Sequence, residues 1–166
     1  GTPMKKLMIS TLLVALSMNA MAQETAKAEE AAAAGADKCA ITISGDDAMK
    51  FDVKEFSINK SECPEFTVTL KHVGKLPAVA MGHNVVVTKK ADMEAVAKDA
   101  IDAGPAKEYI KEGDERIVAH TKLIGSGQED SVTFKTEGLE SGTEYEFFCS
   151  FPGHYAVMKG GITVSE

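Results

Sequence analysis

The chain has 166 residues, of which 44% are hydrophobic, 18 are Lys or Arg and 25 are Asp or Glu, for a formal net charge of -7. This length favours a single domain, and the hydrophobic fraction is large enough to build a core. The acidic balance excludes a protein that binds nucleic acid through clustered basic charge, because such clusters are needed to meet phosphates.

Residues 1–22 have the composition of a secretory signal. Two lysines follow Met4 and precede an apolar run over 7–16, and small residues then occupy 20 and 22, where a signal peptidase needs them. We expect 1–22 to be vector or start residues plus a cleaved signal, with the cut before Gln23. A run of about ten apolar residues is too short to cross a membrane. We therefore predict a periplasmic protein with no membrane span.

Residues 23–38 are rich in Ala with Glu and Lys mixed in, and they have no apolar face to bury. We interpret them as a flexible leader. From Cys39 onwards the sequence changes to short alternating stretches separated by Gly-rich turns, which is typical of strands. The expected strands are 39–44, 51–58 with a bulge, 66–72, 84–87, 116–120, 131–135, 144–149 and 161–164.

Residues 91–103 instead show helical spacing, and Gly104-Pro105 ends that pattern. The apolar residues at helical spacing are Met93, Val96, Ala97, Ala100 and Ile101. Many short strands with one helical segment indicate an all-β domain over 39–166, an antiparallel sandwich or barrel with one inserted helix.

The chain has three cysteines, so in an oxidising compartment two should pair and one is left over. Cys39 begins the first strand and Cys63 lies just before the third, and a bridge between them would close a loop of about 25 residues at one end of a sandwich. Cys149 is the odd cysteine and lies among phenylalanines. It is either a metal ligand or a buried, inert thiol.

The segment from Cys149 to Met158 places a thiol, an imidazole (His154) and a thioether on one short loop. Soft sulfur with imidazole selects copper, and two His, one Cys and a weak axial Met form the blue-copper ligand set. A second His must come from elsewhere, from His72, His83 or His120. We choose His83, because it follows Gly82, which lets the backbone approach a metal closely.

Several of these segments together resemble the azurins, over nearly all of 39–166. The matching motifs are Met81-Gly82-His83-Asn84, His120-Thr-Lys-Leu-Ile-Gly-Ser-Gly127, Asp130-Ser-Val-Thr-Phe134 and Phe148-Cys-Ser-Phe-Pro-Gly-His154. The resemblance implies a cupredoxin fold, a Greek-key β-sandwich of about eight strands with an inserted helix. It implies the Cys39–Cys63 disulfide as well. One departure is Val85, which stands where azurins often have a buried Trp, and the chain has no Trp at all.

The same resemblance implies a ligand set for one copper ion per chain. His83, Cys149 and His154 would form a trigonal set, with Met158 and the Gly82 carbonyl as weak axial contacts. Asn84 and the Phe151 amide fall where azurins hydrogen-bond the thiolate, and such contacts hold the ligand and tune a metal site.

The implied function is electron transfer, with no catalysis, at a type 1 site that alternates between Cu(II) and Cu(I). The edge of His154 would reach the surface inside an apolar patch for transient partners. We expect this patch to comprise Met49, Leu76, Met81 and Val157. For Met49 and Leu76 the alternative is plain core packing. Expected partners are c-type cytochromes or periplasmic reductases, and we expect a monomer.

Two histidines are not assigned to the metal. His72 falls where azurins have a partly buried, titrating His near the site, and it either couples the site to pH or is a structural His. His120 is expected on the surface.

Three other functions are open to this sequence. An enzyme, with a type 1 domain of a multicopper oxidase or nitrite reductase, would need further His ligands for a catalytic copper. Phe148 and Ser150 flank Cys149 where a trinuclear oxidase has His on both sides. A copper-buffering protein would use the same ligands. Zinc also accepts His and Cys.

Overall fold

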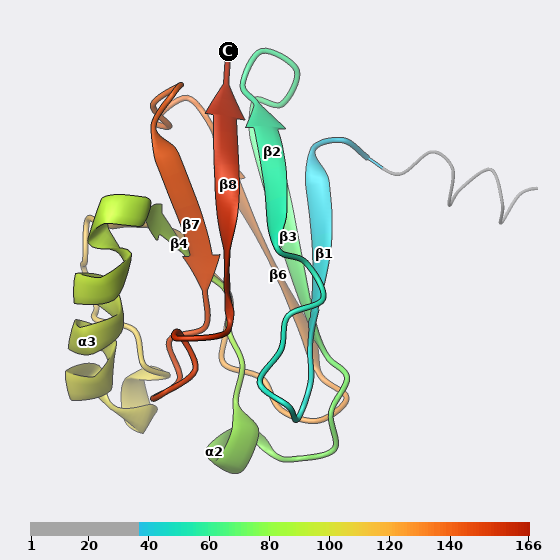
Figure 1. The fold of residues 1–166 in the computed structure, drawn as a ribbon, viewed down its shortest axis with the longest axis vertical. Coiled ribbons are helices and arrows are strands. Elements are labelled where there is room, and N and C mark those ends of the chain that lie inside the picture. The colour runs from blue at the N-terminus through green and yellow to red at the C-terminus, as the bar shows by residue number, and fades with distance from the viewer. Residues whose placement is uncertain (1–36) are drawn as a thin grey trace, which may run out of the picture. The chain divides into compact units, whose positions relative to one another are not determined.

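In the computed structural model, residues 37–166 form a two-layer β-sandwich (Figure 1). The predicted signal and all but the last two residues of the predicted leader lie outside the described residues. The strands are β1 (Ala40–Gly45), β2 (Glu55–Asn59), β3 (Glu65–His72), β4 (Val86–Lys89), β5 (Ile117–His120), β6 (Glu129–Lys135), β7 (Glu144–Phe148) and β8 (Lys159–Ser165). The helices are α2 (Ala78–Met81) and α3 (Met93–Ala103), with short 3-10 turns at Lys90–Asp92 and Pro105–Lys107. Within 37–166, no helix is long and apolar enough to cross a membrane.

The strands form a three-stranded sheet, β1-β3-β6, and a five-stranded sheet, β2-β8-β7-β4-β5. The expectation of a purely antiparallel sandwich is wrong, because β1 pairs with β3 and β2 with β8 in parallel. The reason is the path of the chain. The chain crosses from β1 to β2 in the other sheet and back to β3. As a result, β1 and β2 each pair with a strand that does not directly follow them in the sequence. The cupredoxin-like sandwich of eight strands with an inserted helix is confirmed.

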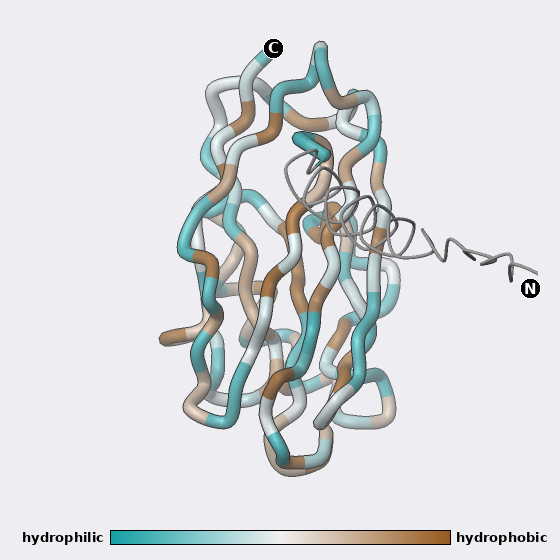
Figure 2. Tube along the Cα trace, turned by 90° about the vertical axis from the view of Figure 1, so that its right-hand side faces the viewer, coloured by the Kyte–Doolittle hydropathy of each residue, from teal (hydrophilic) through white to brown (hydrophobic). Residues whose placement is uncertain are grey.

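The core lies between the two sheets and is filled by alternate residues of their strands. Figure 2 shows hydrophobic and hydrophilic residues alternating along the tube. Phe56 stacks on Phe66 with ring centroids 5.5 Å apart, and Phe147 lies 5.3 Å from Phe56. Val85 is 1% exposed, so its aliphatic side chain is part of the core. Each fully buried side chain of this size contributes about 1.5–3 kcal/mol.

The segment 51–58 does not form one bulged strand. Phe51 makes an isolated bridge with Gly45, and β2 begins only at Glu55. Phe51 is buried in the core, whereas Val53 is only partly buried against it. The alternation slips at this point because the chain is crossing from one sheet to the other.

The predicted helix is confirmed as α3, preceded by a 3-10 turn and ended by Gly104 at φ 77°. Its buried side chains pack against Val86 and Phe148, on the outer face of the five-stranded sheet. The buried helix residues are Met93, Val96, Ala97 and Ala100. Ile101 was expected on the same face, but it is 46% exposed, because the helix touches the sheet along a narrow stripe.

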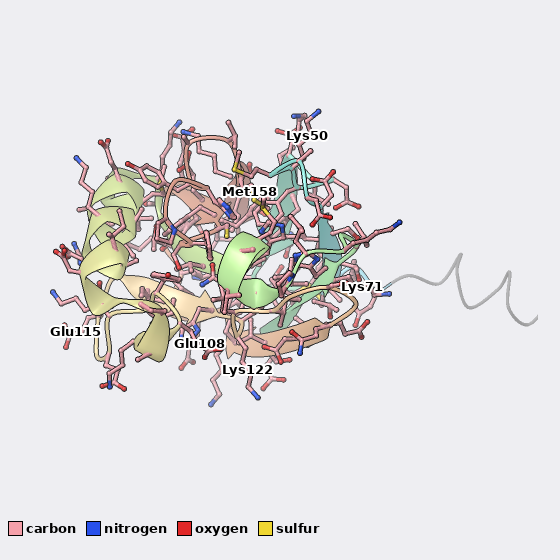
Figure 3. All side chains as sticks on the ribbon, turned by 90° about the horizontal axis from the view of Figure 1, so that it is seen from below. Lys50, Lys71, Glu108, Glu115, Lys122 and Met158 are labelled. Atoms are coloured by element: carbon pink, nitrogen blue, oxygen red, sulfur yellow. A yellow bond between two sulfur atoms is a disulfide. The ribbon has the colours of Figure 1, made fainter. Side chains whose placement is uncertain are left out.

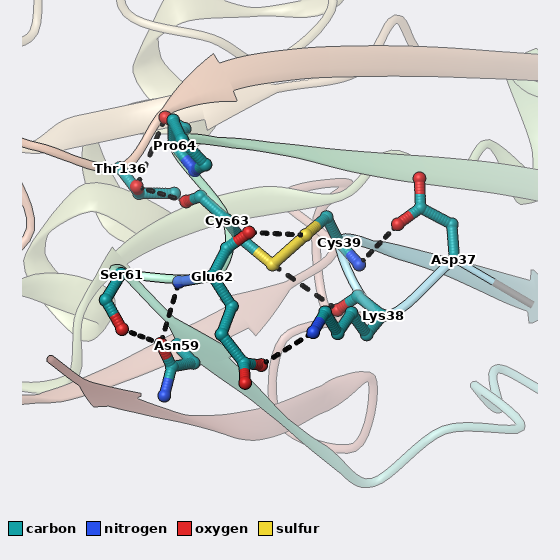
Figure 4. Close-up of a disulfide and its surroundings, with 9 residues drawn as sticks. All are labelled: Asp37, Lys38, Cys39, Asn59, Ser61, Glu62, Cys63, Pro64 and Thr136. Atoms are coloured by element: carbon teal, nitrogen blue, oxygen red, sulfur yellow. Dashed lines mark hydrogen bonds and ion pairs between the residues drawn. A yellow bond between two sulfur atoms is a disulfide. The ribbon is translucent and has the colours of Figure 1, made fainter.

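The predicted disulfide between Cys39 and Cys63 is present and ties the beginning of β1 to the segment before β3 (Figure 4). The last two residues of the predicted leader already contact the domain beside it. The Asp37 carboxylate accepts the Cys39 N–H at 2.8 Å, and Lys38 pairs with Glu62 at 3.3 Å. The bridge lies at the start of β1, and the other end of that strand, Gly45, leads to the candidate site.

Candidate metal centre

Loops at one end of the sandwich bring the candidate ligands together. Figure 3 views the molecule from this end, with α2 near the centre. Cys149 follows β7 directly, and its N–H donates to the Met158 carbonyl at 3.0 Å. Within the loop, the N–H of Met158 donates to the His154 carbonyl at 2.8 Å, and the N–H of His154 to the Phe151 carbonyl at 3.0 Å. The loop that carries three candidate ligands is therefore fixed by its own backbone.

The potential donor atoms of His83, Cys149 and His154 all lie within 4.8 Å of one another. The Cys149 Sγ is 3.6 Å from His154 Nδ1 and 4.0 Å from His83 Nδ1. It also lies 3.7 Å from the Gly82 carbonyl oxygen. His83 and Cys149 are fully buried, and His154 is 3% exposed. Two imidazole nitrogens, a thiol and a carbonyl thus face one small, buried volume.

The ring of His83 is held by a main-chain oxygen. Its Nε2 lies 2.7 Å from the carbonyl of Asp46, in the turn after β1. A carbonyl only accepts, so Nε2 carries the proton and the lone pair is on Nδ1, the nitrogen that faces Cys149. Such hydrogen bonds orient metal-binding histidines.

Met158 is fully buried beside this cluster. A Cβ placed on Gly45 would lie 3.3 Å from the Met158 methyl and 2.8 Å from His83 Cδ2, so these two side chains converge on the end of β1. Gly82 is equally confined, because a Cβ there would lie 2.6 Å from the Ala78 carbonyl oxygen. Both glycines are needed for close approach around the site.

Burial decides the protonation states of the cluster. It raises the pKa of the Cys149 thiol to about 12, although the backbone N–H groups of Asn84 and Phe151 act to lower it. Burial lowers the pKa of His154 to about 4, with a further contribution from nearby His83. The pKa of His83 is lowered for the same first reason, desolvation. Without a metal, the site at pH 7 is therefore a neutral thiol with two neutral imidazoles.

These residues fit copper. A buried thiolate is unfavourable on its own, and a metal cation that replaces the thiol proton would compensate its negative charge. The soft sulfur and the two imidazole nitrogens are donors that suit copper. The thioether of Met158 adds a further soft donor beside the cluster.

The side chain of Asn84 binds Ser150. The Asn84 Oδ1 accepts the Ser150 N–H at 2.8 Å, and Asn84 Nδ2 donates to Ser150 Oγ at 2.8 Å. Asn84 follows one candidate ligand and Ser150 follows another, so the pair ties the two ligand segments together. Sequence reasoning missed this role of Ser150, and the signal for it was its place beside Cys149.

The two remaining histidines of the described chain lie apart from the donor atoms. His72 is 3% exposed and stacks on His83 with ring centroids 4.6 Å apart. Its Nδ1 accepts the Gly74 N–H at 3.1 Å and its Nε2 donates to the Met81 carbonyl at 2.8 Å, so both ring nitrogens are occupied. It is more deeply buried than expected. His120 is exposed, as predicted.

The loops and α2 at this end carry exposed apolar side chains. Met49 is 37% exposed, Leu76 40% and Val157 61%, so the alternative of core packing for Met49 and Leu76 is wrong. Met81 is half-buried. Sequence reasoning missed two more exposed residues, Val73 at 61% and Val79 at 89%. We call these six side chains the apolar face.

Comparisons with known proteins agree with this geometry. The sequence model of the family described as copper binding proteins, plastocyanin/azurin family, matches residues 18–165. The azurin of Alcaligenes faecalis is 55% identical over 128 residues, which cover 77% of this chain and 99% of that protein. The azurin of Bordetella pertussis is 56% identical over 129 residues, 78% of this chain and 85% of that one. The azurin of Pseudomonas putida is 50% identical over 127 residues, 76% and 98% respectively. The chain therefore belongs to the plastocyanin/azurin family of copper-binding proteins, whose members carry electrons and are not enzymes.

Proposed function

We propose that this chain is a periplasmic electron carrier in which His83, Cys149 and His154 hold one copper ion. The Met158 thioether and the Gly82 carbonyl would hold it more weakly. The observation that supports this most directly is the buried group of three donor atoms, all within 4.8 Å of one another. When bound, copper supplies a one-electron couple between Cu(II) and Cu(I).

The chain itself supplies rigidity, because electron transfer is fast only when the ligands move little between the two states. His83 is fixed through its Nε2 by the Asp46 carbonyl. Cys149 is fixed through its backbone by Met158, and its following residue by Asn84. The whole cluster is buried, so water does not compete for the ligands.

We further propose that electrons enter and leave through the apolar face. His154 is the candidate ligand that keeps some solvent exposure, 3%, whereas His83 has none. A small apolar surface suits brief contacts with redox partners, whose interfaces are typically below about 1,200 Å². The chemistry fits c-type cytochromes or periplasmic reductases, met by a monomer of this chain.

The remaining proposals concern processing and compartment. We propose that 1–22 are removed on export, that 23–38 form a leader and that 39–166 form the cupredoxin domain. The disulfide between Cys39 and Cys63 supports an oxidising compartment. Mass spectrometry of the protein recovered from the periplasmic fraction would give the first residue of the mature chain, and Gln23 is expected.

An absorption spectrum after addition of Cu(II), before and after ascorbate, tests the electron carrier. We expect an intense band near about 600 nm from the thiolate and Cu(II), which bleaches on reduction and returns on reoxidation. Bound copper without that band would overturn the type 1 site. A protein whose band bleaches but which loses its copper on redox cycling would favour copper buffering. A protein that takes up zinc and binds Cu(II) without colour would point to the zinc alternative.

A further inference from the structure

Two consecutive residues beside the site have an unfavourable backbone. Glu108 has φ 54° and Tyr109 has φ 56°, both in the left-handed region that residues with a Cβ rarely adopt. Local hydrogen bonds hold them there. The Tyr109 N–H donates to the Gly104 carbonyl at 3.0 Å, and the Glu108 carboxylate accepts the Leu123 N–H at 3.2 Å. Strain that the surroundings impose in this way often marks a functional position.

The carbonyl groups of this turn point at the pair formed by Asn84 and Ser150. The Ser150 hydroxyl lies 2.7 Å from the Tyr109 carbonyl oxygen, and Asn84 Nδ2 lies 3.5 Å from the Glu108 carbonyl oxygen. The left-handed backbone thus directs two acceptors toward buried side chains, one of them at short distance.

The directions of these hydrogen bonds follow from the groups involved. The amide Nδ2 of Asn84 can only donate, so Ser150 Oγ accepts from it. The single hydroxyl proton of Ser150 then points to the Tyr109 carbonyl, which can only accept. Asn84 and Ser150 are 0% and 2% exposed, so no water replaces an acceptor that moves away.

The arrangement bears on the sulfur of Cys149. The backbone N–H groups of Asn84 and Phe151 act to lower the pKa of the Cys149 thiol, which places both near its sulfur. Ser150 lies between Cys149 and Phe151 in the chain, and the Asn84 side chain holds the Ser150 backbone. Movement of the pair would therefore move both N–H groups relative to the sulfur.

We propose that the left-handed turn at Glu108 and Tyr109 is a positioning device for the copper-binding thiolate. It aims the Tyr109 carbonyl at Ser150, completes the hydrogen bonds of the Asn84 and Ser150 pair, and so fixes the surroundings of Cys149 Sγ. This inference rests on the proposed function, because its main readout is the copper site. It assigns a role to residues outside the ligand loops, in the connection after α3.

The Tyr109 side chain has a separate contact that the test must remove from consideration. Its ring lies edge-on to Phe151 at 5.3 Å, and Phe151 lies 4.5 Å from the His154 ring. Two substitutions that both delete this ring isolate the backbone effect. Tyr109→Gly keeps the left-handed conformation accessible, whereas Tyr109→Val disfavours it because Val is β-branched.

We expect the copper-loaded Tyr109→Val variant to show a shifted reduction potential and a displaced thiolate band. The Tyr109→Gly variant should stay close to the unsubstituted protein in both properties. In the copper-free protein, we expect hydrogen exchange at the Ser150 amide to accelerate by about tenfold or more in Tyr109→Val, relative to Tyr109→Gly. A merely structural role would lower stability without moving the potential or the band.

Ser150 provides an independent arm, which also serves if Tyr109→Val does not fold. Ser150→Ala removes the hydroxyl and should shift the potential, and Ser150→Thr, which keeps a hydroxyl, should restore it. The double variant Tyr109→Val with Ser150→Ala should shift no further than either single variant, because both break one connection.

Equal shifts in Tyr109→Gly and Tyr109→Val would overturn the proposal in favour of the aromatic contact. Additive shifts in the double variant, or no shift in Ser150→Ala, would overturn it as well. A parent protein that binds copper without the intense band would instead contradict the proposed function. The exchange comparison in the copper-free protein would still decide whether the turn holds Ser150.

Discussion

Single atoms decide whether the ligands can approach one another, and Gly45 is the sharpest case. A methyl group there would lie 2.8 Å from His83 Cδ2 and 3.3 Å from the Met158 methyl. We expect Gly45→Ala to push the His83 ring out of line and to weaken copper binding by about 10–100-fold. Competition with a chelator of known affinity measures the loss. Gly161→Ala is the matched control, since a Cβ there meets nothing within 4 Å. Equal affinities of the two variants would contradict the role of Gly45.

The low pKa of His154 predicts how the copper-free protein responds to acid. In the folded chain the His154 imidazole becomes protonated only near pH 4, whereas in the unfolded chain it becomes protonated near about pH 6.5. The unfolded state therefore binds more protons between these values, so stability falls as the pH is lowered from about 6.5 to 4. Denaturant unfolding at pH 7 and pH 5 should show this loss. His154→Asn should reduce it, and only in part, because the pKa of His83 shifts in the same direction. A loss of equal size in that variant would contradict the prediction.

At the scale of residues, spacing on one loop was enough to predict Cys149, His154 and Met158 as neighbours. His83 could be chosen because Gly82 precedes it. Ser150 could not be assigned a role in the same way, since a small polar residue has no periodicity and its partner Asn84 lies 66 positions away. The sequence likewise carries no signal for the left-handed backbone at Tyr109.

At the scale of elements, the disulfide and the site belong to opposite ends of β1. Cys39 precedes this strand, and Gly45, at its far end, touches His83. We expect the double variant Cys39→Ser with Cys63→Ser to lose about 3 kcal/mol of stability, from the freed loop of 24 residues. Its absorption spectrum with copper should remain that of the parent. A shifted band in a folded variant would show that strain passes along the strand.

The helix offers a second comparison between elements. Val96 is 2% exposed against the sheet, and Ile101 is 46% exposed on the same helix. Val96→Ala should cost about 1–2 kcal/mol, because a buried side chain is truncated and Ala regains a little helix propensity. Ile101→Ala should change stability by less than about 0.5 kcal/mol. Denaturant unfolding at one pH measures both, and equal costs would contradict the packing described here.

Strand positions could be predicted well from alternation, since period-two burial is a local property. Which strands pair is not local, and for this reason the parallel partners of β1 and β2 were missed. The same limit explains 51–58, where burial of Phe51 mimics a strand although the chain is crossing between sheets. Ile101 was assigned to the buried face because the spacing of apolar residues shows which side of the helix is buried. That spacing does not show how wide the buried stripe is.

At the scale of the whole molecule, the apolar face contrasts with an acidic chain of net charge -7. Val79, 89% exposed, lies on this face, and Ile101 is an exposed apolar residue on α3. We expect Val79→Glu to slow electron exchange with a cytochrome by on the order of tenfold, because docking would bury the new charge. Ile101→Glu should leave the rate unchanged. Stopped-flow absorption measures both rates, and equal slowing would place docking elsewhere.

The acceptor that aligns His83 is the main-chain oxygen of Asp46, and every residue has such an oxygen. Point mutations at this position can change charge or size, but none can delete the acceptor. Substitutions at this position therefore have little effect on the orientation of the His83 ring, whereas an insertion or deletion in the turn after β1 would displace the acceptor. Among descendants of this sequence, the length of that turn should be conserved more strictly than the identity of its residues.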